Sequence, residues 1–189
     1  MRHKHTVLLA CACALAALVC AATLRADPGP DPPPTTTATT TDTAPVPDLD
    51  LIERIIAHHR QEAWRWERVM GAPLTRGLPN PPDDPAQRAE AWRRLAARAH
   101  RQAMNVPHKA AWLCIHRFEG SWTDPNPPYY GGLQMDLQFQ RTYGAGLLRR
   151  KGTADHWTPL EQMWTAERAH RAGRGFYPWP NTARYCGLI

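Results

Sequence analysis

The fold is decided by residues 108–135, which read HKAAWLCIHRFEGSWTDPNPPYYGGLQM. In this stretch Trp112, Ile115 and Glu119 are spaced at i, i+3 and i+7, so they share one face of a helix. The spacing predicts a helix from His108 to Glu119 that ends at Gly120. Glu119 is therefore expected in the last turn, on the face that packs inward.

The expected position of Glu119 suits acid catalysis. The helix dipole disfavours negative charge at a helix C-terminus, and aromatic neighbours exclude water, so both effects favour the protonated carboxyl. A glutamate that stays protonated near neutrality is what a glycosidase uses as its general acid. A glutamate at a helix end is more often an ordinary surface residue, so the assignment depends on what surrounds it.

The segment after Glu119 is typical of a sugar-binding groove. Paired glycines at 131 and 132 let the backbone come close to a ligand. Aromatic rings with polar edges suit the alternating apolar and hydroxyl surfaces of a sugar. At least one of the rings is expected to be ordinary core. The candidate substrate-binding residues are Trp122, Tyr129, Tyr130, Gly132 and Gln134.

These motifs resemble the catalytic segment of the resuscitation-promoting factors of actinobacteria, which are transglycosylase-like domains of the lysozyme superfamily. The similarity lies in the run from Glu119 to Trp122, in YYGGLQM at residues 129–135, and in Trp179-Pro180 and Cys186-Gly187 near the end of the chain. The resemblance covers about residues 110–187. It implies a small lysozyme-like domain in which Glu119 is the single catalytic residue and peptidoglycan glycan strands are the substrate.

The chain also departs from that family. In the family a cysteine directly precedes the catalytic glutamate, whereas here Phe118 takes that place and Cys114 lies earlier in the same helix. Residues 123–128 replace the Asn and Gly residues that follow the family's aromatic residue, and residues 149–152 extend the middle of the domain. These differences bear on substrate preference and on turnover.

The N-terminal part indicates export. Residues 1–26 are typical of a secretory signal peptide, with a charged start, an apolar run and small residues after it. A retained membrane anchor and a lipid anchor on Cys20 are the alternatives. Residues 27–47 are rich in Pro and Thr, which predicts a disordered linker. The chain is therefore expected to be secreted and to act in the cell wall, with the membrane as a partner only if the signal segment is not cleaved.

Removal of the signal peptide changes the charge and the cysteine count. The segment holds three of the basic residues and no acidic one, so the formal net charge of +6 becomes +3. That charge suits an anionic wall and is too weak to indicate nucleic acid as a partner. Of the five cysteines only Cys114 and Cys186 remain, an even pair in an oxidising compartment, which predicts a disulfide. Two buried free thiols are the alternative.

Residues 48–106 predict an α-helical hairpin. Apolar side chains recur at helical spacing as far as Met70, and Gly71 ends this first helix. Asp84 is the expected N-cap of the second helix, with Pro85 at its first position. The Arg-rich outer face of the hairpin is more often solvated than functional, and the hairpin as a whole is a candidate for docking a protein partner. The arginines are Arg93, Arg94, Arg98 and Arg101.

The fold class is therefore expected to be mainly α, with the hairpin followed by a lysozyme-like (transglycosylase-like) domain over residues 107–189. Two more helix starts are predicted there. Asp136 is the expected N-cap of a short helix from Leu137 to Thr142, and the run from Thr158 to Glu161 is a capping box.

The expected reaction is cleavage of the β-1,4 bond between N-acetylmuramic acid and N-acetylglucosamine. Glu119 gives its proton to the glycosidic oxygen, and either water or the muramoyl 6-hydroxyl then attacks the sugar. A conventional glycosidase needs a second carboxylate about 5 to 9 Å away. The nearby candidates are Asp124, Asp136 and Asp155, and none is compelling. The absence of a compelling second carboxylate fits the single-glutamate chemistry that the resemblance to the resuscitation-promoting factors implies.

No cofactor is expected, and no metal, because His116, His156 and His170 have no ligand spacing to a second His or Cys. Two other classes of function stay open. One is a non-catalytic peptidoglycan-binding module in which Glu119 only accepts hydrogen bonds from sugar. The other is a structural or signalling envelope protein whose hairpin docks a partner.

Overall fold

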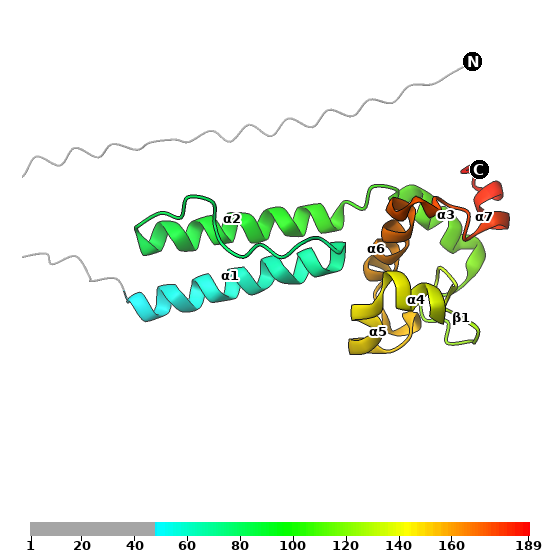
Figure 1. The fold of residues 1–189 in the computed structure, drawn as a ribbon, viewed down its shortest axis with the longest axis horizontal. Coiled ribbons are helices and arrows are strands. Elements are labelled where there is room, and N and C mark those ends of the chain that lie inside the picture. Colours follow the sequence, from blue (N-terminus) through cyan, green and yellow to red (C-terminus); the bar gives the residue numbers. More distant parts are fainter. Residues whose placement is uncertain (1–47) are drawn as a thin grey trace, which may run out of the picture. The chain divides into compact units, whose positions relative to one another are not determined.

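The computed structural model describes residues 48–189, so the signal peptide and linker predictions lie outside the described residues. The described residues belong to one compact unit, Pro45–Ile189. They are mainly helical, as the sequence predicted (Figure 1). In chain order the elements are α1 (Leu49–Met70), α2 (Pro85–Met104), α3 (Lys109–Glu119), β1 (Tyr129–Tyr130), β2 (Met135–Asp136), α4 (Leu137–Tyr143), α5 (Ala145–Lys151), the 3-10 helix η1 (Ala154–His156), α6 (Pro159–Ala169), the π-helix η2 (His170–Arg174) and α7 (Pro180–Tyr185).

Helices α1 and α2 lie side by side as the predicted hairpin (Figure 1). Gly71 ends α1 in the left-handed region, with φ of 70°. Asp84 caps α2 by accepting a hydrogen bond from the amide of Gln87 at 2.9 Å. Helix α1 also buries a polar residue, Glu67, which is 7% exposed. Its carboxylate accepts hydrogen bonds from the backbone amide and the hydroxyl of Thr75 in the connecting loop.

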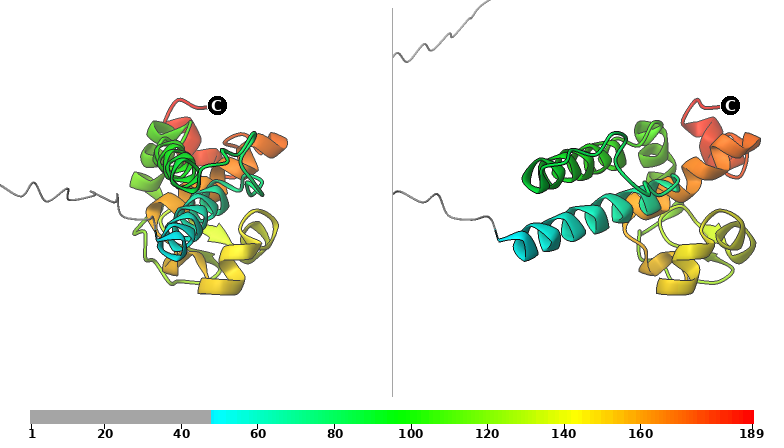
Figure 2. Two further views of the ribbon diagram at one scale, coloured as in Figure 1. Left: turned by 90° about the vertical axis from the view of Figure 1, so that its left-hand side faces the viewer. Right: turned by 60° about the vertical axis from the view of Figure 1, so that its left-hand side comes forward.

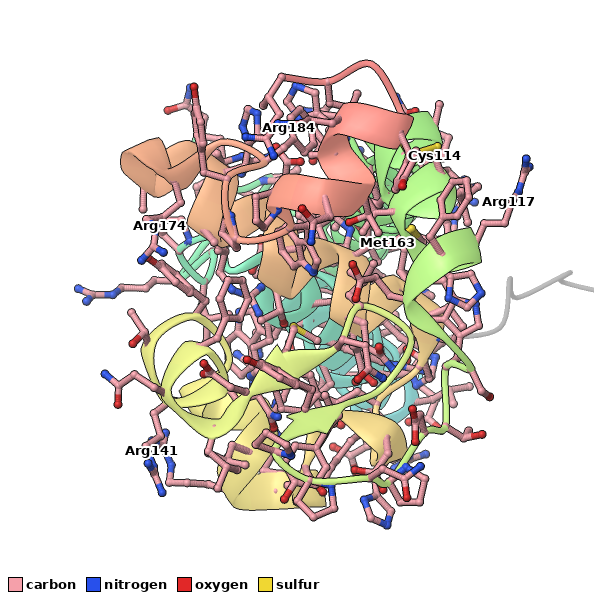
Figure 3. All side chains as sticks on the ribbon, turned by 90° about the vertical axis from the view of Figure 1, so that its right-hand side faces the viewer. Cys114, Arg117, Arg141, Met163, Arg174 and Arg184 are labelled. Carbon is pink, nitrogen blue, oxygen red and sulfur yellow. A yellow bond between two sulfur atoms is a disulfide. The ribbon has the colours of Figure 1, made fainter. Side chains whose placement is uncertain are left out.

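Helix α6 is the centre of the C-terminal part. Residues 161–167 are all buried, and α1, α3 and α4 contact this helix. Its start is the predicted capping box of Thr158 and Glu161. Figure 3 shows Met163 of α6 among packed side chains, whereas Arg141 extends outward. The same core contains the largest buried rings, Trp112, Trp157, Trp164 and Trp179.

The hairpin packs on this core instead of hanging free (Figure 2). Met70 and Ala103 belong to the same buried cluster as the tryptophans of the C-terminal part. The indole of Trp164 donates a hydrogen bond to the carbonyl of Ala103 at 2.7 Å, and Arg168 donates to the carbonyl of Val69 at 3.0 Å. The sequence left this relation open.

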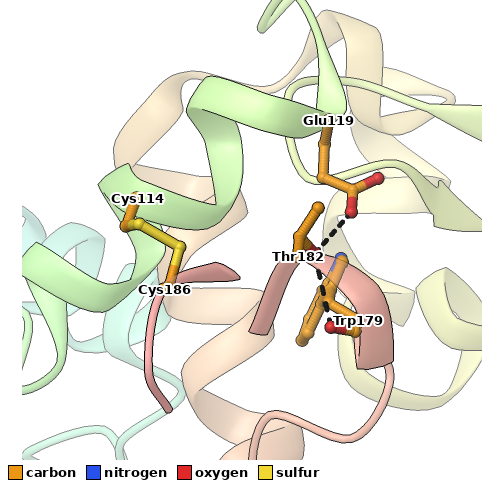
Figure 4. The surroundings of a disulfide bond; sticks show 5 residues. All are labelled: Cys114, Glu119, Trp179, Thr182 and Cys186. Carbon is orange, nitrogen blue, oxygen red and sulfur yellow. Dashed lines mark hydrogen bonds between the residues drawn. A yellow bond between two sulfur atoms is a disulfide. The ribbon is translucent and has the colours of Figure 1, made fainter. Parts of the chain in front are cut away.

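The predicted disulfide between Cys114 and Cys186 is confirmed. It joins α3 to the residue that follows α7 (Figure 4). The two cysteines are 72 residues apart in sequence. The bond therefore fixes the end of the chain beside the helix that carries Glu119.

Within residues 48–189 none of the helices combines the length and the apolar character needed to cross a bilayer.

Candidate active site

Glu119 is the last residue of α3 and is half-buried. Gly120 ends the helix with φ of 140°, a conformation that favours glycine. The hydroxyl of Thr182, in α7, donates a hydrogen bond to Oε1 of Glu119 at 2.7 Å (Figure 4). Among the described residues Glu119 forms no salt bridge. Its carboxyl therefore has a neutral partner and no fixed counter-charge.

A groove of about 220 Å³ opens beside this carboxyl. Three parts of the chain form its walls: the end of α3, the β1–β2 turn region and the segment that leads into α7. The lining residues are Glu119, Tyr129, Gln134, Pro178, Trp179, Pro180 and Asn181. Glu119 is the only ionisable group among them apart from the Tyr129 phenol, so the groove is polar and has a single carboxyl.

The β1–β2 hairpin decides which tyrosine reaches the groove. The strands are antiparallel, with Tyr129 opposite Asp136 and Tyr130 opposite Met135. Successive side chains of a strand point to opposite faces. Tyr129 is 50% exposed and lines the groove, whereas Tyr130 is half-buried against the core.

Gln134 takes an unusual backbone conformation that sets its side chain. Its φ is 46°, the left-handed region that a residue with a Cβ rarely adopts. Its side-chain nitrogen Nε2 donates to Oδ2 of Asp124 at 2.9 Å and to the carbonyl of Gly131 at 3.0 Å. Such strain persists where the surroundings hold it, and it is frequent at functional sites. Asp124 thus positions Gln134 and does not itself line the groove.

Three of the candidate sugar-binding residues do not line this groove. Trp122 stacks on His116 with ring centroids 3.9 Å apart, and its carbonyl accepts a hydrogen bond from the buried Gln162. Gly132 is buried, and a Cβ there would lie 2.5 Å from the His116 ring and 2.7 Å from that of Trp122. Trp122 and Gly132 hold the loop onto His116 of α3, and Tyr130 packs against the core. Their contact with a sugar stays a prediction.

The groove also has residues that the sequence did not single out as ligands. Trp179 is 4% exposed, and its indole donates to the carbonyl of Leu133 at 2.6 Å, which ties the segment before α7 to the β1–β2 turn. Pro180 begins α7, and Asn181 and Thr182 follow in its first turn. Trp179-Pro180 could have been found from the sequence, because it is one of the motifs that the chain shares with the resembled family. Thr182 could not, because it lies 63 residues from Glu119 and belongs to no motif.

The other nearby carboxylates have structural partners. Asp136 caps α4 as predicted and accepts a hydrogen bond from the amide of Phe139 at 2.6 Å. Asp155 lies 3.1 Å from the ring of His156. In the part of the chain that the structure describes, Glu119 is the only carboxylate on the groove wall.

A larger cavity, of about 470 Å³, lies where the hairpin meets α5 and α6. Its lining includes four basic residues, Arg65, Arg68, Arg150 and Lys151, and one acid, Glu161. Glu161 is committed to its capping box and to Lys151. No free acid or nucleophile faces this cavity, so the smaller groove is the better candidate for chemistry.

Comparison of the chain with protein-family models, with curated proteins and with solved structures found no match in any of the three.

Proposed function

We propose that the chain is a secreted peptidoglycan-cleaving glycosidase or lytic transglycosylase, with a lysozyme-like domain, that uses Glu119 as its single general acid and base. The observation that carries the proposal is a half-buried carboxyl, free of any salt bridge, on the wall of a groove that has no second carboxylate among the described residues. The sequence resemblance to the resuscitation-promoting factors supports the same assignment.

In the proposed first step the protonated Glu119 donates its proton to the glycosidic oxygen between N-acetylmuramic acid and N-acetylglucosamine. The bond from that oxygen to the anomeric carbon breaks, and positive charge develops on the sugar. The Glu119 carboxylate then accepts a proton from the attacking group. If that group is water, the product has a reducing end; if it is the muramoyl 6-hydroxyl, the product is an anhydro sugar.

The other groove residues would orient the sugar. The exposed ring of Tyr129 offers an apolar face to a sugar ring. The side-chain amide nitrogen of Gln134 is already held by Asp124 and Gly131, which leaves the amide oxygen to accept a sugar hydroxyl. A groove of about 220 Å³ has room for little more than one sugar unit next to the acid.

The test is digestion of purified peptidoglycan by the wild-type protein and by Glu119→Gln. The proposal expects soluble muropeptides from wild type and a decrease of at least about 100-fold in the variant, which still sediments with the wall. Glu53→Gln is a matched control, because the Glu53 side chain is 64% exposed on α1, and it should digest like wild type.

The mass of the products separates the two reaction types, since an anhydro end is lighter than a reducing end by one water. If both wild type and Glu119→Gln bind the wall but release no muropeptides, the enzyme hypothesis is wrong and a non-catalytic peptidoglycan-binding module is the better hypothesis. Absence of wall binding would leave the envelope docking protein as the better hypothesis.

A further inference from the structure

A second cluster of chemically active side chains lies at the other end of α3. His108 is the residue that precedes this helix, Glu167 lies near the end of α6, and His170 begins η2. Each offers one ligand atom, and these atoms all lie within 4.8 Å of one another. Nδ1 of His108 is 3.0 Å from Oε2 of Glu167, and the two histidine rings are 4.1 Å apart between centroids.

The local backbone brings two of the three residues together. Glu167 and His170 are three residues apart, which places them on the same helix face. After His170 the helix ends in a wide turn at Gly173, whose left-handed φ of 85° favours glycine. His108 comes from 59 residues earlier, so no spacing in the sequence reveals the cluster.

Glu167 is held as a metal-binding carboxylate would be. It is 1% exposed, although it carries a carboxylate. The indole of Trp112 donates to its Oε2 at 3.1 Å, and Nε of Arg171 donates to its Oε1 at 3.3 Å. Such outer partners orient the ligands of protein metal sites. Arg171 forms an ion pair with Oε1, whereas Oε2 is the oxygen that faces His108.

We propose that His108, Glu167 and His170 bind a zinc ion. Two imidazoles and one carboxylate are ligands that zinc accepts in tetrahedral sites, with a solvent molecule at the fourth position. Ligand atoms of one zinc lie about 3.4 Å apart for bonds of about 2.1 Å. The spacing of His108 and Glu167, 3.0 Å, is already close to that value, and all the ligand atoms lie within 4.8 Å of one another.

The surroundings of the histidines fit this role. The side chain of His108 is 41% exposed, which gives the ion a path from solvent. Zinc binding at Nδ1 of His108 would replace the His108–Glu167 hydrogen bond, with the single proton of the neutral ring then on Nε2.

The site would clamp the start of α3 to the end of α6. Helix α3 has 11 residues, so at a rise of 1.5 Å per residue its two ends are about 16 Å apart. The proposed zinc site is therefore separate from the groove around Glu119. It is independent of the proposed function, and a failure of either leaves the other standing.

The experiment is titration of the purified full-length chain, free of any histidine tag, with Zn²⁺ in a calorimeter and with Co²⁺ followed by visible absorption. We expect one ion per chain, the absorption bands of four-coordinate cobalt, and a higher Tm with zinc. His108→Ala and His170→Ala should each weaken zinc binding at least about tenfold. His156→Ala is the matched control, because that ring is 64% exposed and outside the cluster, and it should bind like wild type.

Unfolding of each variant without metal checks that the fold is intact. His108→Ala decides the matter if His170→Ala does not fold, since His108 lies outside the helix body and is partly exposed. Absence of stoichiometric zinc binding by wild type would overturn the proposal. So would zinc binding by His108→Ala equal to that of His156→Ala, because the cluster would then be only a buried acid with histidine neighbours.

Discussion

The hydroxyl of Thr182 has one proton and two nearby acceptors. Oε1 of Glu119 is 2.7 Å away and the carbonyl of Trp179 is 3.3 Å away. When Glu119 is ionised, Thr182 donates to it. When Glu119 is protonated, the carboxyl can donate to the Thr182 oxygen while Thr182 donates to the Trp179 carbonyl. Thr182 can therefore form a hydrogen bond with either form of the carboxyl, which the proposed role of Glu119 as general acid and then base would require.

Substitution of Thr182 by valine keeps the shape of the side chain and removes this bond. We expect muropeptide release to fall about three- to tenfold, which corresponds to the loss of one hydrogen bond of about 1 kcal/mol. Thr182→Ser keeps the hydroxyl and should retain most of the activity. Release by Thr182→Val at the wild-type rate, with Glu119→Gln inactive, would show that Thr182 has no part in the reaction.

A methyl group at Gly132 has no room. Its Cβ would lie 2.5 Å from the His116 ring and 2.7 Å from the Trp122 ring, two groups that are stacked on each other. Gly132→Ala should therefore lower the free energy of unfolding by about 1–3 kcal/mol, as overpacking does, measured with urea. Gly77→Ala is the control, because a Cβ there meets nothing within 4 Å. Equal stability of the two variants would mean that the loop moves away at no cost.

Thr182 and Gly132 also show what could not be predicted from the sequence. The sequence proposed Glu119 through its place on a helix face, which is a local property, and its role stays a prediction. It assigned Trp122 and Gly132 to ligand binding from residue type. Only the fold reveals that Trp122 stacks on His116 and that the Gly132 carbonyl lies 3.1 Å from the same ring. Thr182 gave no signal, because its contact with Glu119 exists only after α7 has packed beside α3.

At the scale of the helix, local caps made the boundaries predictable. Asp84, Asp136 and Thr158 each accept a hydrogen bond from a backbone amide three residues later, so sequence and structure agree on these starts. The π-helix η2 and the two-residue strands β1 and β2 were not predicted. Both are short local turns, which leave no repeating hydrophobic pattern in the sequence.

Helix α6 also shows how an acid at a helix start stabilises the fold. Nζ of Lys151 donates to the Glu161 carboxylate at 2.7 Å, and the backbone amide of Thr158 donates to it at 2.8 Å. Burial by itself raises the pKa of Glu161, but the hydrogen bonds from Lys151 and Thr158 outweigh it, so the pKa lies below its ordinary value.

Because the folded state lowers this pKa, the contribution of Glu161 to stability is present above the unfolded value of 4.5 and is lost as the pH falls through the folded value. Glu161→Gln should therefore cost about 1–2 kcal/mol at pH 7. The difference from wild type should shrink steadily below about pH 4.5. The measurement is urea unfolding of both proteins from pH 7 to pH 3. A difference that stayed constant over this range would assign the effect to shape and not to charge.

At the scale of the whole described chain, Arg168 joins parts that are far apart in sequence. Its guanidinium donates to the carbonyl of Val69 in α1 at 3.0 Å and to that of Tyr143 in α4 at 2.5 Å. Burial, and next the neighbouring Arg171, lower the pKa of Arg168 to about 10, so it stays charged at neutral pH. The side chain also passes close to Gly71, where a Cβ would lie 2.6 Å from it. The hairpin and the C-terminal part therefore share one partly buried cation.

Replacement of Arg168 by methionine should test whether this shared group makes the described chain one cooperative unit. The change leaves the carbonyls of Val69 and Tyr143 without their charged donor, which should cost about 2–4 kcal/mol. In wild type, unfolding followed by far-UV signal, from all the helices, and by near-UV signal, from tryptophans in both parts, should coincide. Arg141→Met is the control, because Arg141 is exposed in α4 and should leave the midpoint unchanged. Two separate transitions already present in wild type would mean that the hairpin folds independently, and Arg168 would then be a contact between two domains and not part of a single core.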